Sequence, residues 1–200
     1  MSNNYSNSFV IFASSIGFFY NTAEKFKDDT IFLNKKSDNC TPSFHLLSSL
    51  VVELLPKVLI ALDVCLKYKN KQNQEISQDD LIKEISKEMN KFGHNLEKLY
   101  KNFPDLMSYL NIKDIEEYPP KAVISRRDYF VWQYNFTFID YINPVMIKNI
   151  EAIRYGSFAN KPDVATICID DDKIIDFLEK LDNYVIQKKA ETREILLSSL

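Results

Sequence analysis

The sequence predicts an all-α fold of about five or six helices joined by polar loops. Apolar side chains recur every three or four residues through most of the chain, the spacing that stacks them on one helix face. Only 3 glycines occur among 200 residues, whereas β-sandwiches and glycine-rich phosphate-binding folds use glycine freely in turns. The composition, 46% apolar and 26% charged, is that of a globular protein. We expect residues 1–8 to form a disordered tail and 9–200 a single helical-bundle domain.

The first helix is expected over residues 9–26, where apolar side chains return at helical spacing. The apolar run 9–20 is as long as a signal-peptide core, but no Lys or Arg precedes it, and a core helix is favoured. Residues 27–42 are expected to form a loop, which could include a short extended piece at 31–33.

The most apolar helical pattern runs from Ser43 to Lys69. It leaves only a narrow polar strip, on which Glu53 and Lys57 stand four residues apart and can pair. A helix that is apolar nearly all round is normally the buried, central one. A membrane span over 46–66 is the alternative, but charged side chains fall inside it and Pro56 should bend it. We therefore expect a core helix and no membrane partner.

Shorter helices should follow this central one. Asp79 or Asp80 can cap a third helix, which Gly93 should end because glycine accepts the left-handed backbone found there. Two short helical pieces are expected within 94–110, and the double proline at 119–120 excludes a continuing helix.

Residues 128–139 fit two different structures. Aromatic and β-branched side chains alternate there, which predicts a short extended segment near 128–138, but the same residues also fit an aromatic helix leaning on the core. A helix with Pro144 in its first turn should come next. A long amphipathic helix that follows the acidic run 170–172 completes the bundle.

Most motifs of catalytic and metal-binding sites are absent from the sequence. It contains no glycine-rich phosphate loop, no nucleophile elbow and no cysteine pair at metal-ligand spacing. Cys40, Cys65 and Cys168 are expected to be reduced thiols of a cytoplasmic protein. The acidic run 170–172 could hold a cation, but capping of the last helix is favoured. We therefore assign no catalytic residue, metal or cofactor.

Two arginines are a candidate contact for nucleic acid. Arg126 and Arg127, followed by Tyr129 and Trp132, could hold an RNA strand by charge and stacking. The net charge of −3 gives no general attraction to nucleic acid, so RNA binding would need such a local patch. A surface arginine pair beside core aromatics is the favoured interpretation.

A bundle could also bring polar residues from separate segments together. In the structural interpretation, Glu53 and Arg154 form a buried ion pair between two helices, and His94 caps a helix start. In the functional interpretation, the cluster is a pocket for a nucleotide or an RNA phosphate. Its members would be Glu53, Lys57, His94, Arg154 and Tyr155.

Three short motifs, in this order, resemble the HEPN superfamily (higher eukaryotes and prokaryotes nucleotide-binding). They are SFHLLSSLVVELLPK, which contains Glu53 and Lys57, then GHNLEKLY, then EAIRYG. The match covers about residues 10–190, and Pro56 departs from it, since Leu or Ala is more usual there.

The resemblance implies an up-and-down helical bundle that is often dimeric, with many members in prokaryotic defence or toxin–antitoxin systems. Catalytic members are metal-independent endoribonucleases with an Arg, four to six intervening residues and a His. That motif is absent here, because neither His45 nor His94 follows any arginine. Other members without the motif look like binding or partner subunits.

We therefore expect a cytoplasmic, non-catalytic, HEPN-like protein that forms a homodimer and binds RNA, a nucleotide or a partner protein. The first alternative is an endoribonuclease with a non-standard site, in which His94 acts with Arg154 or Arg126. The second is an obligate subunit of an enzyme encoded by a neighbouring gene.

Overall fold

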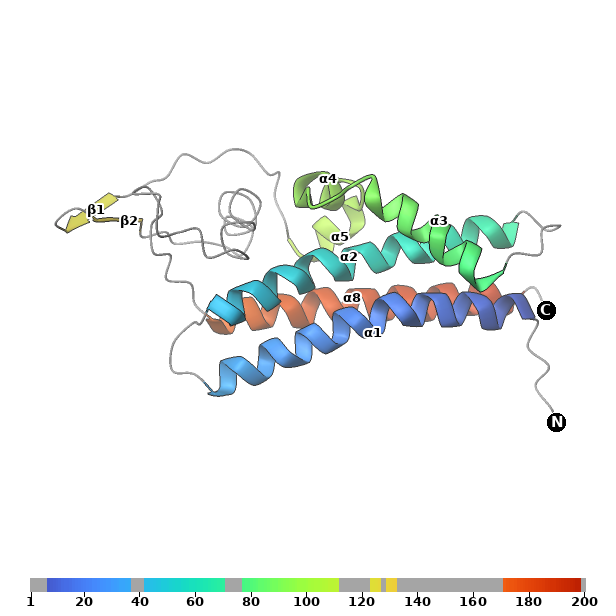
Figure 1. The fold of residues 1–200 in the computed structure, drawn as a ribbon, viewed down its shortest axis with the longest axis horizontal. Helices are drawn as coiled ribbons and strands as arrows, with labels where there is room; N and C mark the ends of the chain where they lie inside the picture. The colour runs from blue at the N-terminus through green and yellow to red at the C-terminus, as the bar shows by residue number, and fades with distance from the viewer. Residues whose placement is uncertain are drawn as a thin grey trace.

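The computed structural model describes residues 7–36, 42–70, 77–111, 123–126, 129–132 and 171–198. Three long helices lie side by side, and α3 and α4 pack against α2 (Figure 1). The prediction of an all-α bundle is confirmed for the described helical part of the chain. Its six helices are α1 (Asn7–Lys36), α2 (Pro42–Asn70), α3 (Gln78–Asn90), α4 (Leu96–Lys101), α5 (Pro104–Tyr109) and α8 (Asp171–Leu197).

Helix α2 is the central helix of the core, as its apolar pattern predicts. It contacts α1, α3, α4 and α8, and most of its side chains between Val51 and Cys65 are buried. Pro56 lies inside the helix without ending it. Among the described helices, none is long and apolar enough to cross a membrane.

Helix α1 is longer than the sequence pattern predicts. It runs to Lys36, so the expected loop over 27–42 and the extended piece at 31–33 are wrong for residues 27–36. Two polar side chains that interrupt the apolar pattern of α1 after Phe26 form polar interactions. Lys27 forms an ion pair with Asp182 of α8, and buried Thr30 donates a hydrogen bond to the Phe26 carbonyl over 2.7 Å. Helix α1 also includes residues 7 and 8 of the expected tail.

The caps of α3 and α4 differ from the predicted ones. Ser77, not Asp79 or Asp80, caps α3: its backbone is extended, and its hydroxyl accepts the Asp80 amide. A cap must lie just outside the helix, and both aspartates lie within it. Asn95, not His94, caps α4 by accepting the Lys98 amide over 2.8 Å.

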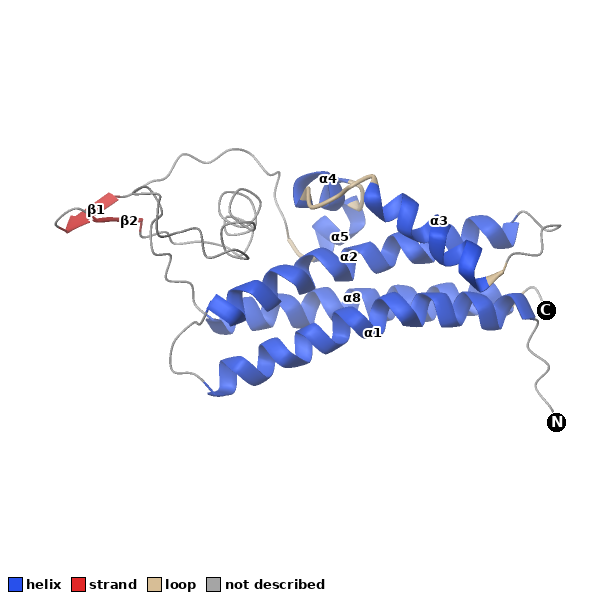
Figure 2. Cartoon of the chain, in the orientation of Figure 1, coloured by secondary structure: helices blue, strands red, loops and turns tan. Residues whose placement is uncertain are grey.

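The structure also contains a two-stranded antiparallel ribbon. Strands β1 (Val123–Arg126) and β2 (Tyr129–Trp132) pair with each other, with Val123 opposite Trp132 (Figure 2). The strand alternative is therefore correct for 129–132. The remainder of 128–139 and the helix expected around Pro144 lie outside the described residues.

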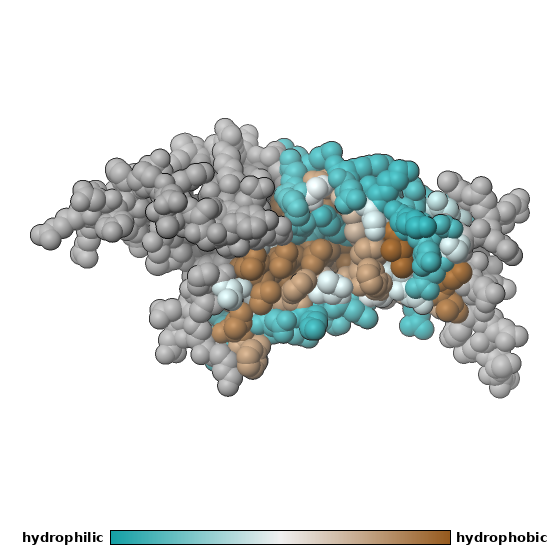
Figure 3. Space-filling model, viewed as in Figure 1, coloured by the Kyte–Doolittle hydropathy of each residue, from teal (hydrophilic) through white to brown (hydrophobic). Residues whose placement is uncertain are grey.

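The described bundle also exposes apolar surface. On the face drawn in Figure 3, an apolar band crosses the described bundle between more polar margins. Exposed apolar side chains include Val10, Phe18 and Phe32 of α1 and Ile195 of α8.

Candidate functional site

Three of the predicted site residues meet where α2 faces the turn between α3 and α4. Glu53 lies on α2 with its side chain only 5% exposed, and Lys57 lies one helical turn later. Lys57 donates from Nζ to Glu53 Oε1 over 2.7 Å and to the carbonyl of Gly93 over 2.8 Å. One ammonium group therefore joins α2 to the α3–α4 turn.

His94 is the exposed member of this cluster. Its Nδ1 lies 3.0 Å from both carboxylate oxygens of Glu53, while 61% of its side chain is exposed. A carboxylate only accepts hydrogen bonds, so Glu53 holds the imidazole with a proton on Nδ1. The site therefore presents an oriented imidazole ring to solvent.

The partners of Glu53 keep its carboxyl group ionised. Burial raises the pKa of Glu53, but hydrogen bonds from Lys57 and His94 lower it by more, so the pKa lies below its ordinary value. Gly93 allows this geometry because its φ of +52° lies in the left-handed region that glycine accepts without strain. The turn thus places a backbone carbonyl and an imidazole beside one carboxylate.

A further contact beside the cluster holds α4 against α2. Tyr100 of α4 is buried and donates from its hydroxyl to the carbonyl of Val52 over 3.1 Å. Pro56 has no N–H, so it cannot give Val52 the usual hydrogen bond from four residues later in the helix. Tyr100 supplies the missing donor. We did not predict this contact, although the spacing of Val52 and Pro56 was visible in the sequence.

The remaining predicted site residues, Arg126, Arg127, Arg154 and Tyr155, are not seen in this cluster within the described part of the chain. Arg154 and Tyr155 lie outside the described part of the chain, and with them the predicted Glu53–Arg154 ion pair. Arg126 is in β1, where its register partner is Tyr129. Arg127 also lies outside the described residues.

A second buried polar cluster, which the sequence pattern did not predict, joins α1 to α8. Asp182 is 3% exposed, accepts the Tyr20 hydroxyl over 2.9 Å and forms an ion pair with Lys27. The Lys189 ammonium lies 3.2 Å from the centroid of the Tyr20 ring. Burial lowers the pKa of Lys189 and raises that of Tyr20. These contacts hold two long helices in register.

Neither cluster has the donor set of a metal centre. Within the described ranges, no group of three or more His, Cys, Asp or Glu side chains could hold a metal ion. Cys65 is buried in the core, and burial raises the pKa of its thiol to about 12. A hollow of about 460 Å³ lies along α8 and shares no residue with the Glu53 cluster. Its lining residues are Lys189, Ala190, Arg193, Glu194 and Leu197.

The fold and the site define a helical-bundle protein with an exposed histidine held by a buried carboxylate. No protein-family model, curated protein or solved structure matches the chain significantly. The resemblance to the HEPN superfamily therefore stays a prediction.

Proposed function

We propose that this chain is a HEPN-like, non-catalytic binding protein whose site contacts a phosphate group of RNA or of a nucleotide. The observation that carries the proposal is the exposed His94 ring, held at Nδ1 by the buried Glu53 carboxylate. A protonated imidazole beside a carboxylate is a donor for a charge-assisted hydrogen bond to phosphate. The ammonium of Lys57 is already used by Glu53 and Gly93, so His94 is the contact group.

The resemblance extends the proposal to biological context. On that ground we propose a cytoplasmic homodimer that acts in prokaryotic defence or in a toxin–antitoxin pair, with a partner protein encoded nearby. A neighbouring gene for a nucleotidyltransferase or an antitoxin would support this context.

Direct binding tests the proposed site. Fluorescence anisotropy with labelled single-stranded RNA and with labelled nucleotides should detect binding that His94→Ala weakens about tenfold or more. The ring is largely exposed, so this variant should keep the helical circular-dichroism spectrum. Lys83→Ala removes a cation on α3 that is even more exposed than His94 (77% against 61%) and lies away from the site, and it should leave the affinity unchanged. The proposal fails if the wild-type chain binds neither ligand, or if His94→Ala binds as well as wild type.

The Glu53–His94 pair also supports a second candidate, a metal-independent endoribonuclease. A carboxylate that orients an imidazole is the arrangement by which enzymes position a general base. Arg154 or Arg126 would then steady the phosphate charge. Incubation of mixed RNAs with wild-type and His94→Ala protein separates the candidates, because cleavage that disappears in the variant indicates the enzyme.

A further inference from the structure

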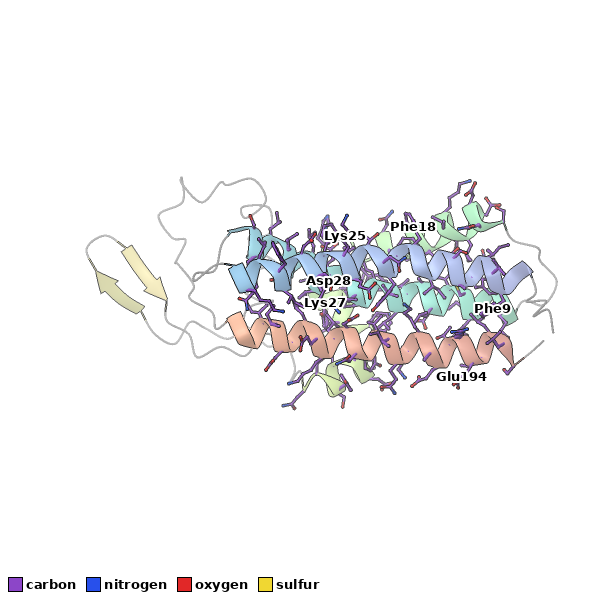
Figure 4. All side chains as sticks on the ribbon, turned by 90° about the horizontal axis from the view of Figure 1, so that it is seen from below. Phe9, Phe18, Lys25, Lys27, Asp28 and Glu194 are labelled. Carbon is purple, nitrogen blue, oxygen red and sulfur yellow. The ribbon has the colours of Figure 1, made fainter. Side chains whose placement is uncertain are left out.

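A line of side chains runs along the solvent face of α1. Ile11, Phe18, Lys25 and Phe32 are seven residues apart, so each lies about two turns after the last and nearly in line with it. Phe18 is 59% exposed and Phe32 is 58% exposed, while Ile11 is partly buried. Figure 4 shows Phe18 and Lys25 on the side of α1 away from α8, whereas Lys27 points toward α8.

Phe18, one of the two aromatic residues of this line, contacts a neighbouring ring. The Phe18 ring meets the Phe19 ring edge to face, with 5.2 Å between centroids, and Phe19 packs against the core. Large exposed aromatic side chains on a helix face mark contact surfaces, because their burial by a partner removes apolar area from water.

The line is complementary to itself when two copies run antiparallel. Phe18 and Lys25 are equally far from the midpoint between Asn21 and Thr22, and Ile11 and Phe32 are also equally far from it. A two-fold axis at this midpoint places Phe18 against Lys25 of the second copy, a cation–π contact made twice. It also places Ile11 against Phe32 of the second copy.

The charges favour this arrangement over a parallel one. Parallel helices in register would set Lys25 against Lys25, which is a repulsive pair. In the antiparallel arrangement, no like charges on the line face each other, and Asp29 falls opposite Ser14 of the second copy. Asp28 and Asp29 flank the line on its two sides and lie at the rim, where interfaces accept charge.

From this complementarity we infer that α1 is the dimerisation surface, and that it packs antiparallel on α1 of a second copy about a two-fold axis between Asn21 and Thr22. The inference rests on the homodimer of the proposed function and names its surface. It is independent of the ligand proposed for His94.

Sedimentation velocity of the full chain over a range of concentrations tests the inference. The wild-type protein should show a species of twice 23.4 kDa. Phe18→Lys should raise the dimer dissociation constant about tenfold or more, because it replaces each of the two cation–π contacts with a repulsive pair of lysines, Lys25 of one copy against the new lysine of the other. The side chain is exposed, so the circular-dichroism spectrum should stay unchanged. Ile195→Lys replaces an exposed apolar residue on α8 and should leave the dimer intact.

A second substitution tests the register. Adding Lys25→Phe to Phe18→Lys exchanges the two members of the cation–π pair and should restore the wild-type dissociation constant. If Phe18→Lys does not weaken the dimer, or if the double variant does not restore it, α1 is not the dimerisation surface, although the protein is still a homodimer. If the wild-type chain stays monomeric at every concentration, both the α1 surface and the proposed homodimer are wrong, whatever the affinity for RNA or nucleotide.

Discussion

Glu53 is charged although it is buried, and its neighbours explain why. Burial disfavours a carboxylate, but Lys57 and His94 both donate to it, and the net effect is a lowered pKa. Removing one partner of such a group leaves the others unsatisfied, which costs more than the intact contact contributes. The stability of the α2 region should therefore depend on this one carboxylate.

Glu53→Gln should lower the free energy of unfolding by about 2 kcal/mol, because the Lys57 ammonium loses its buried charge partner. Urea denaturation followed by circular dichroism measures this change. The matched control is Glu84→Gln, which removes the ion-pair partner of Lys87. Glu84 is more exposed than Glu53, so this substitution should have a much smaller effect. Equal losses in the two variants would contradict the assigned role of Glu53.

The lowered pKa of Glu53 also sets a pH dependence. The unfolded carboxyl group takes up a proton near its ordinary pKa of 4.5, while the folded one stays ionised to lower pH. The stabilisation is therefore present above pH 4.5 and is lost as the pH falls through the folded-state pKa. Urea midpoints measured between neutral and acidic pH should fall less steeply for Glu53→Gln than for the wild-type protein.

Helix α2 illustrates how one element depends on another. A proline inside a helix leaves a carbonyl without its donor, and in α2 that carbonyl, on Val52, receives the hydroxyl of Tyr100 from α4. The short helix α4 has only six residues and would not be stable alone. The Tyr100 contact explains both the tolerance of Pro56 and the docking of α4.

A double-mutant cycle tests this coupling. Tyr100→Phe should cost about 1–3 kcal/mol in the wild-type background, because it leaves the Val52 carbonyl buried without a donor. In a Pro56→Ala background, the new N–H of residue 56 can bond to Val52, and the same substitution should cost less. Thermal or urea unfolding of the four proteins gives the coupling energy. A cost that is equal in both backgrounds would show that Tyr100 does not compensate for Pro56.

At the level of the whole molecule, Asp182 joins the first described helix to the last. Its partners Tyr20 and Lys27 lie 162 and 155 residues away in the sequence. Loop closure over such a separation is entropically costly, so only a cooperatively folded bundle can hold these groups together. The packing of α1 against α8 should therefore be sensitive to this one buried acceptor.

Asp182→Ala should destabilise the protein by about 3 kcal/mol, since it leaves the largely buried Lys27 ammonium without its counter-ion. Differential scanning calorimetry measures the change, and the exposed Asp176 on the same helix provides the control. Asp176→Ala should leave the melting temperature nearly unchanged. Similar shifts for the two variants would contradict a special role for Asp182.

The predictions were correct where one local pattern was decisive. The apolar spacing around Leu55 predicted the central helix, and Gly93 predicted the end of α3 to within three residues, although the helix ends at Asn90 with Lys91 as a right-handed C-cap. The predictions were wrong where a distant partner changed the outcome. The charged residues that follow Phe26 looked like a loop, but Lys27 has its counter-ion on α8, and the helix continues.

The all-α class, the buried central helix and the Glu53–Lys57 pair could be predicted from the residues alone, because they follow from periodicity and from contacts four residues apart. Three contacts depend on the packing of the helices: His94 joins the Glu53–Lys57 pair, Tyr100 donates to the Val52 carbonyl, and Asp182 holds α1 against α8. Each of these contacts links segments far apart in the chain. Periodicity describes one helix at a time, whereas the packing of helices against one another determines which distant polar groups meet.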